Sequence, residues 1–219
     1  MLAKDAPGAP ARKSLRDYGR VLAGGDAWWF MFFYSVTFGG FSGLASSLTI
    51  YFNSQYGLSP VTAGYFTAAC VFAGSLVRPM GGRIADRIGG IKTLSIMYIL
   101  AASFLFIAST GLQSAMGAVI VFVCAMLALG TGNGAVFQLV PQRFRKEIGV
   151  MTGLVGMAGG VGGFYLASSL GYSKQITGSY QTGLMIFASL AVVALIGLSA
   201  VKNRWRTTWG SAAMTTAKI

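Results

Sequence analysis

The sequence contains no histidine, two cysteines and only five acidic residues in a chain of 219. Charged residues make up 10% of it, whereas a soluble domain averages about 25%. Without histidine, and without a nucleophile beside a base, the groups that most often carry acid–base and covalent catalysis are missing, so an enzyme is not expected. Both cysteines, Cys70 and Cys124, fall in long apolar segments, where a small apolar role is expected instead of a disulfide. No metal site and no cofactor is predicted.

Hydrophobic residues make up 54% of the chain, and they gather in long windows that are nearly free of charge. A helix needs about 20 mostly apolar residues to span a bilayer. The polar segment 111–114 divides the longest window into two, so the sequence predicts an all-α membrane protein with six transmembrane helices. These helices are expected at Ala27–Tyr51, Val61–Gly82, Thr93–Thr110, Ala115–Leu139, Ile148–Leu170 and Ser179–Val201.

The net charge is +12, but the positive residues are not spread evenly along the chain. All lysines and arginines except Arg78 and Lys174 fall in residues 1–26, in residues 202–219, or in the connections after the second and fourth predicted helices. With six spans these segments share one side of the membrane, and the positive-inside rule makes residues 1–26 a cytoplasmic leader and residues 202–219 a cytoplasmic tail. Residues 27–201 are the transmembrane domain. The expected location is the cell membrane, and no nucleic-acid partner is expected, because such a partner would not require charge at every second connection.

Arg78 is exceptional, because it stands at the end of an apolar helix in the segment "FAGSLVRPMGG". A charge at the centre of a membrane helix costs about 2.5–3.5 kcal/mol on insertion scales. One explanation is that the long side chain reaches the headgroups, since the helix end is near. The helical neighbours three and four positions away favour an interior position instead, because all are small or polar: Gly74, Ser75, Gly81 and Gly82. The bulky residues lie on the other side: Phe72, Leu76 and Met80.

An interior arginine requires a counter-charge, because a buried unpaired charge is among the costliest arrangements in a protein. The acidic residues all fall in the leader, in connections or at helix ends: Asp5, Asp17, Asp26, Asp86 and Glu147. The missing counter-charge is therefore predicted to be a substrate, a small anion. Guanidinium is a planar fork that suits planar oxyanions.

Three further residues are candidates for the same site. Tyr34 and Phe38 are four residues apart on the first predicted helix, and aromatic edges or a phenol hydroxyl can favour an anion. Aromatic residues at this spacing in a membrane helix more often serve ordinary packing. Asn133, flanked by two glycines in "GTGNGAVFQLVPQRF", is an amide donor at membrane depth, with a hydrogen bond between helices as its structural alternative.

The fifth predicted helix carries glycines spaced alternately four and three residues apart, at Gly149, Gly153, Gly156, Gly160 and Gly163. Such a stripe lets another helix or a ligand approach to backbone distance. Packing against a helix and lining of a cavity are both compatible with the pattern.

The connection "GGRIADRIGG", residues 81–90, resembles the signature of the major facilitator superfamily, which follows the second helix of each six-helix half. Its expected conformational residues are Gly82, Arg83, Asp86, Arg87 and Gly90. Asp86 is expected to favour the start of the third helix electrostatically and to form ion pairs with Arg83 and Arg87.

Together with "LVRP", "GNGAVFQLVPQRF" and the glycine run, this signature resembles the carboxy-terminal half of the nitrate/nitrite porter family, over about residues 28–201. The resemblance implies that Arg78 grips the anion, that Tyr34 and Phe38 line its site, and that Gly149–Gly163 is the glycine-rich nitrate signature. It further implies half of a secondary transporter for nitrate or nitrite that works by alternating access. The family has about twelve helices, so the expected partner is an amino-terminal half or another copy of this chain, and the chain is expected to be a split or truncated product. The alternative is a non-transporting membrane subunit or a truncated remnant. Because no group with a pKa near neutrality is expected at membrane depth, the sequence favours anion exchange over proton coupling.

Overall fold

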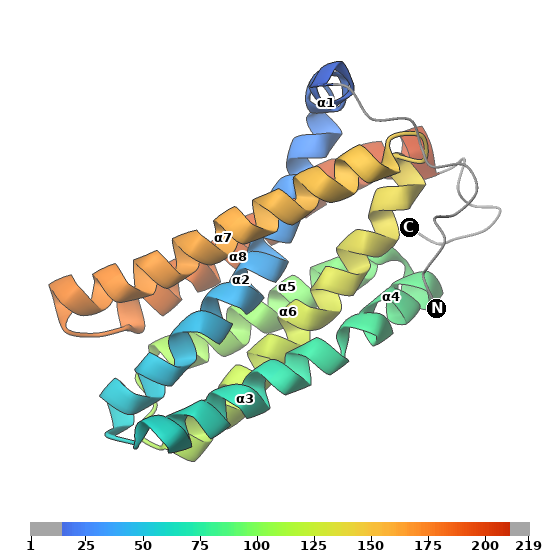
Figure 1. Ribbon diagram of the computed structural model, residues 1–219. Coiled ribbons are helices and arrows are strands. Elements are labelled where there is room, and N and C mark those ends of the chain that lie inside the picture. Colours follow the sequence, from blue (N-terminus) through green and yellow to red (C-terminus); the bar gives the residue numbers. More distant parts are fainter. Residues whose placement is uncertain (1–14, 211–219) are drawn as a thin grey trace, which may run out of the picture.

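The computed structural model describes residues 15–210, and every regular element in this range is helical. Figure 1 shows the long helices lying side by side in one bundle, with the short helix α1 at one end. The elements are α1 (Leu15–Leu22), α2 (Gly25–Tyr56), α3 (Pro60–Leu76), α4 (Arg78–Ile88), α5 (Gly90–Ser109), α6 (Ala115–Arg143), α7 (Ile148–Thr177), α8 (Gln181–Trp205) and the π-helical turn η1 (Arg206–Gly210). The predicted leader and tail lie partly outside the described residues.

Five helical segments in the described part of the chain are long and apolar enough to cross a membrane: Pro60–Ile88, Gly90–Ser109, Ala115–Arg143, Ile148–Thr177 and Gln181–Trp209. The protein is therefore a multi-pass membrane protein, as predicted. The remaining long helix, α2, has 32 residues, but it is not among these candidate spans. It packs against α3, α6, α7 and α8, so much of its surface contacts protein. A spanning role for α2, and with it the sixth span, stays a prediction.

The segment 81–90 is not the loop that the sequence predicts, because α4 continues as a helix to Ile88. Gly81 and Ala85, four residues apart, are buried, whereas Arg83 and Arg87 are exposed. One buried face that repeats every four residues is the pattern of a helix packed on a neighbour, here α6. The turn into α5 is confined to Gly89, whose φ of 99° favours glycine.

The connection between α3 and α4 is a single residue, Val77, whose own dihedral angles (φ −77°, ψ −15°) stay helical. Pro79 follows Arg78 and lacks a backbone N–H, which agrees with a helix interrupted beside the arginine. Arg78 therefore begins a new helix, close to the point where α3 ends.

Glycines bring α3 and α4 to backbone distance from α6. A methyl group on Gly130 would collide with the backbone oxygen of Gly74, and one on Gly134 would collide with that of Arg78. This contact leaves no room for side chains between the helices and sets the depth at which Arg78 enters the bundle.

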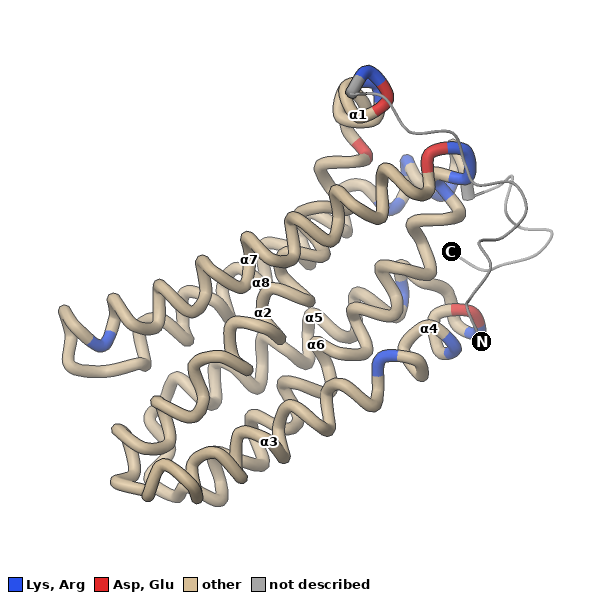
Figure 2. The backbone as a smooth tube through the Cα atoms, in the orientation of Figure 1, with Lys and Arg blue, Asp and Glu red and all other residues tan. Residues whose placement is uncertain are grey.

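Charged residues of the described chain gather at the end of the bundle where α1 and α4 lie, and the opposite end is nearly free of them (Figure 2). This is the segregation that the sequence predicts, because connections on alternate sides of the membrane differ in their lysine and arginine content.

Candidate functional site

Arg78 is half-buried and its side chain lies over aromatic rings of α2. Its guanidinium carbon Cζ is 4.1 Å from the centroid of the Phe41 ring and 5.2 Å from that of Phe38. The bulky residues predicted to lie on the other side of the helix are exposed: Phe72, Leu76 and Met80. The side chain therefore points into the bundle, as its small helical neighbours predict.

No carboxylate in residues 15–210 forms an ion pair with Arg78. Its Nε atom is buried without a hydrogen-bond partner, and none of the ion pairs in the described part of the chain includes it. Cation–π contacts contribute about 0.5–2 kcal/mol, which is less than the several kcal/mol that burial of an ion costs. The guanidinium thus keeps N–H donors available for an oxyanion.

Tyr34 and Phe38 form a stacked pair, with ring centroids 5.2 Å apart and planes 6° from parallel. The ring of Phe137, from α6, stands edge-to-face against that of Tyr34, with ring centroids 4.9 Å apart. The backbone of Gly159, from α7, approaches both rings of the pair. The pair therefore packs between α6 and α7, and Phe38 also contacts the Arg78 guanidinium. This arrangement is compatible with a packing role for the two rings and with contact between them and a bound ion.

Asn133 is 3% exposed, and neither its amide nitrogen nor its amide oxygen has a hydrogen-bond partner among the described residues. The predicted alternative, a hydrogen bond between helices, is therefore not formed there. Thr37 is also buried with an unpartnered hydroxyl, and it packs against Gly132. Because Phe137 lies one turn beyond Asn133 and contacts Tyr34, Asn133 stands on the side of α6 that faces α2. An unsatisfied buried amide costs about 1–3 kcal/mol, so a polar ligand here would be stabilised.

Phe41 and Thr37 were not predicted as site residues. Phe41 is seven residues from Tyr34 and three from Phe38, so helical periodicity places all three on one face. That spacing was a usable signal for Phe41. Thr37 carried no comparable signal, because one threonine in an apolar helix usually bonds its own backbone.

The glycine stripe of α7 divides between two surroundings. Gly149, Gly153, Gly156 and Gly160 are exposed, and a methyl group on any of them would meet nothing within 4 Å. Gly163 is buried, against Ser42 and Gly39 of α2.

The contact between α7 and α2 uses a different set of glycines. Gly162 is half-buried, and a methyl group on it would collide with the Ser35 backbone, while Gly159 and Gly163 are buried against other α2 residues. Four of the five predicted glycines therefore do not pack within the described chain, and they leave one face of α7 bare.

The signature residues connect α4 and α5 to α6. Gly90 is buried where a methyl group would overlap Leu139, and the Gln138 amide donates to Asp86 at 3.1 Å. Gly82 is half-buried, and a methyl group added to it would lie 4.0 Å from the backbone oxygen of Gly134. The prediction that Asp86 forms ion pairs with Arg83 and Arg87 is wrong, because no ion pair of the described residues includes Asp86.

Arg83, Asp86 and Arg87 are all exposed on α4, and neither arginine lies within ion-pair distance of Asp86. Asp86 instead joins α4 to α6 through Gln138.

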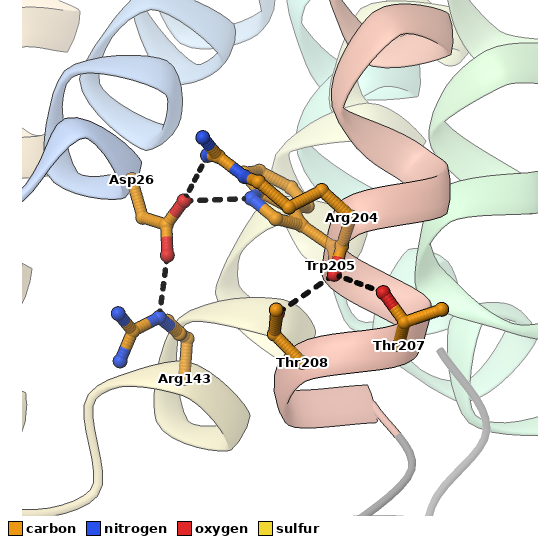
Figure 3. A network of polar contacts seen from close by, with 6 residues as sticks. All are labelled: Asp26, Arg143, Arg204, Trp205, Thr207 and Thr208. Carbon is orange, nitrogen blue, oxygen red and sulfur yellow. Dashed lines mark hydrogen bonds and ion pairs between the residues drawn. The ribbon is translucent and has the colours of Figure 1, made fainter.

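Asp26 forms a polar cluster that the sequence did not predict (Figure 3). One carboxylate oxygen accepts from Nε of Arg143 at 2.6 Å, and the other accepts from Arg204 at 2.5 Å and from the Trp205 indole at 2.8 Å. These partners lie 117 to 179 residues away in sequence, so the cluster ties together the ends of α2, α6 and α8. Burial alone would raise the pKa of Asp26, but the hydrogen bonds and the two arginine charges outweigh it and lower that pKa.

Replacement of Asp26 by asparagine is expected to destabilise the bundle by about 1–3 kcal/mol near neutral pH, because two arginines lose their counter-ion. A carboxyl with a lowered pKa contributes stability above its ordinary pKa, and that contribution is lost as the pH falls through the lowered value. The difference between wild type and Asp26→Asn should therefore shrink below about pH 4. Thermal unfolding in detergent at pH 7 and at about pH 2 measures this, and a pH-independent difference would contradict it.

Comparison with known proteins shows the protein family to which the chain belongs. A family model described as the Major Facilitator Superfamily matches residues 2–167, which is most of the chain. The chain belongs to the major facilitator superfamily. Its relatives include the "Nitrite extrusion protein" of Bacillus subtilis, 34% identical over 77% of this chain and 42% of that protein. The "Probable nitrate transporter NarT" of Staphylococcus carnosus is 38% identical over 67% of this chain and 37% of that protein.

A third relative, the "Probable nitrate/nitrite antiporter NarK1" of Thermus thermophilus, is 31% identical over 77% of this chain and 42% of that protein. These relatives confirm the resemblance to the nitrate/nitrite porter family within the superfamily. The names of these relatives describe transport or extrusion of nitrate or nitrite. The chain spans less than half the length of these curated relatives.

Proposed function

We propose that this chain is one six-helix half of a secondary transporter that moves nitrate, nitrite or both across the cell membrane by alternating access. The observation that carries the proposal is the Arg78 guanidinium, which lies inside the bundle. Among the described residues, its buried Nε has no hydrogen-bond partner and no carboxylate forms an ion pair with it. A planar anion with two adjacent oxygens complements the guanidinium fork. The names of the relatives, which specify nitrate and nitrite, agree with this chemistry.

The site would hold the anion between charge and rings. Arg78 supplies two parallel N–H donors, Phe38 and Tyr34 bound the space beside it, and the Asn133 amide supplies a further donor from α6. Their contacts and burial support these roles, since Arg78 lies over Phe38 and the Asn133 amide is unpartnered in the described residues.

A second half completes the pathway, either an amino-terminal half or another copy of this chain. The bare face of α7, formed by Gly149, Gly153, Gly156 and Gly160, supports this step. A methyl group on these residues meets nothing within the described chain, whereas glycine stripes suit close approach of a second surface. In superfamily transporters built from two halves, the substrate lies between them.

Exchange of anions is the proposed mode of coupling. A positively charged site that must be refilled before it returns needs no titratable group, and the described acidic residues lie at helix ends or connections. Arg78 would then release nitrite on one side only when nitrate, or another anion, replaces it.

Transport by reconstituted protein tests the proposal. Proteoliposomes loaded with nitrite are expected to take up labelled nitrate when they contain this chain with an amino-terminal half, or with a second copy if the chain self-associates. The matched control carries Arg78→Gln. Absence of uptake in every combination, with folded protein in the membrane, would favour a non-transporting subunit.

The proposed orientation has six spans with both termini in the cytoplasm. In a background with Cys70→Ala and Cys124→Ala, single cysteines at Ser54 and Lys174 are expected to react with an impermeant maleimide added outside intact cells. Cysteines at Arg87 and Arg145 are expected to react only after the cells are opened, because both lie at the charge-rich end of the bundle. Outside labelling of either of the latter two would reverse the orientation.

A further inference from the structure

An open pocket of about 440 Å³ lies beside the Asp26 cluster and shares no lining residue with the Arg78 site. It is lined by Gly25, Asp26, Arg143, Arg204, Thr208 and Trp209. The pocket is thus built where α2 begins and where α6 and α8 end, at the end of the bundle that carries the charges. Its lining combines two guanidinium groups, an indole and a hydroxyl.

The charges in this pocket do not cancel. Arg143 and Arg204 share one carboxylate, that of Asp26, so the three groups together keep one positive charge. The Asp26 side chain is only 12% exposed, whereas those of Arg143 and Arg204 are 37% and 53% exposed. The carboxylate is therefore enclosed, and the arginines present the accessible surface.

Hydrogen-bond donors remain available on both arginines. Among the described residues, Arg143 donates to Asp26 through Nε and Arg204 through one terminal nitrogen. The fork of five N–H donors on each side chain is therefore only partly used. The indole Nε1 of Trp209 is also buried and has no hydrogen-bond partner among the described residues. It is an unsatisfied donor on a residue that lines the pocket.

The start of α2 adds to the same field. Gly25 is the first residue of this 32-residue helix, and its N-cap residue, Gly24, provides no side-chain hydrogen bond. Free N–H groups and the positive end of the helix dipole favour an anion there, although Asp26 in the first turn already offsets part of that field.

We propose that the pocket between Arg143, Arg204 and Trp209 binds a phosphate-type oxyanion, supplied either by the headgroup of an anionic phospholipid or by free phosphate in solution. This site is separate from the proposed transport site and does not depend on nitrate transport. Occupancy would give the Trp209 indole an acceptor and neutralise the remaining positive charge, and so clamp the ends of α2, α6 and α8 together.

Glu147 is the acidic residue that would compete with a bound anion for Arg143. It lines an adjoining pocket with Arg20 and Arg143, so Arg143 lies between the two pockets. Arg20 is already paired with Asp17, at 3.6 Å. The phosphate-type ligand is therefore assigned to the side of Arg143 that faces Arg204.

The full chain, with or without its transport partner, is suitable for the test. In the first arm, inorganic phosphate is titrated into detergent-solubilised protein at constant ionic strength, and binding is measured by calorimetry and by the unfolding temperature. In the second arm, phosphate-free protein is incubated with mixed phosphatidylglycerol and phosphatidylcholine, and native mass spectrometry records which lipid stays bound.

Saturable binding of phosphate, selective retention of phosphatidylglycerol, or both would support the proposal and identify the source of the oxyanion. Arg204→Gln is expected to weaken that binding about tenfold or more, because a charge-assisted contact is lost while Asp26 keeps Arg143 and Trp205. Arg145→Gln removes an exposed arginine that does not line the pocket, and binding should be unchanged.

Trp209→Phe provides a second variant if Arg204→Gln fails to fold. It removes only the Nε1 donor and keeps an aromatic ring near Trp205, so the fold should persist while binding weakens. No binding in either arm, or unchanged binding in the folded variants, would overturn the proposal.

Discussion

Replacement of Arg78 by lysine is expected to weaken nitrate binding roughly tenfold to a hundredfold in a transporter assembled with its second half. Lysine keeps the positive charge, but an ammonium is a compact point charge without the planar fork, so two parallel hydrogen bonds become at most one. The aromatic surroundings sharpen this difference, because a planar guanidinium lies well over the Phe41 ring. Binding of labelled nitrate to purified protein measures the effect directly.

The matched control is Arg145→Lys, an exposed arginine between α6 and α7 that lies outside the candidate site. Its nitrate affinity should equal that of the wild type. If Arg78→Lys also binds nitrate with near-native affinity at matched folding, the guanidinium is not the counter-charge of the anion, and the main support for the proposed function is lost.

A second large effect is expected from a pair of glycines on α7. Gly162→Leu should destabilise the helical bundle itself, because its first side-chain carbon would collide with the Ser35 backbone of α2. Overpacking of this kind costs roughly 1–3 kcal/mol or more, and two packed backbones cannot yield as a flexible side chain can. The yield of monodisperse protein and its unfolding temperature in detergent should both fall.

Gly156→Leu is the counterpart on the bare face of the same helix, where a methyl group meets nothing within 4 Å. It should leave the unfolding temperature of the isolated chain unchanged and impair assembly or transport with the second half. Full activity of Gly156→Leu would show that this face meets lipid or open space, whereas destabilisation of the isolated chain would contradict the arrangement of α7 described here.

Much of the fold was accessible from local pattern. Apolar windows and the polar break at residues 111–114 predicted every long helix, although the ends differ by several residues. Helices α2, α6, α7 and α8 each extend beyond the predicted end, because polar residues outside the apolar core of a helix still form its last turns. The helical state of residues 83–88 in α4 was missed, because glycine and charge in residues 81–90 looked like a turn, and only contact with α6 gives that segment a buried face.

The same distinction applies to the candidate site. The interior position of Arg78 followed from its neighbours at three and four residues, which share its helical face by geometry alone. Its contact with Phe41 and Phe38 depends on how α4 meets α2 across the bundle. The absence of a carboxylate at depth was readable from five acidic positions, but the unpartnered state of Asn133 and Thr37 required the packed structure.

By itself, the sequence determined where apolar helices run, which end of the bundle carries charge, and that one arginine lies among small residues. These are properties of periodicity and composition, and they survive in any arrangement of the helices. Only the tertiary structure decided which glycines of α7 pack and which stay bare, and that Asp26 meets arginines 117 and 178 residues away. Glycines on one helix are locally alike and differ only in what a distant segment brings against them, so long-range packing had to make that choice.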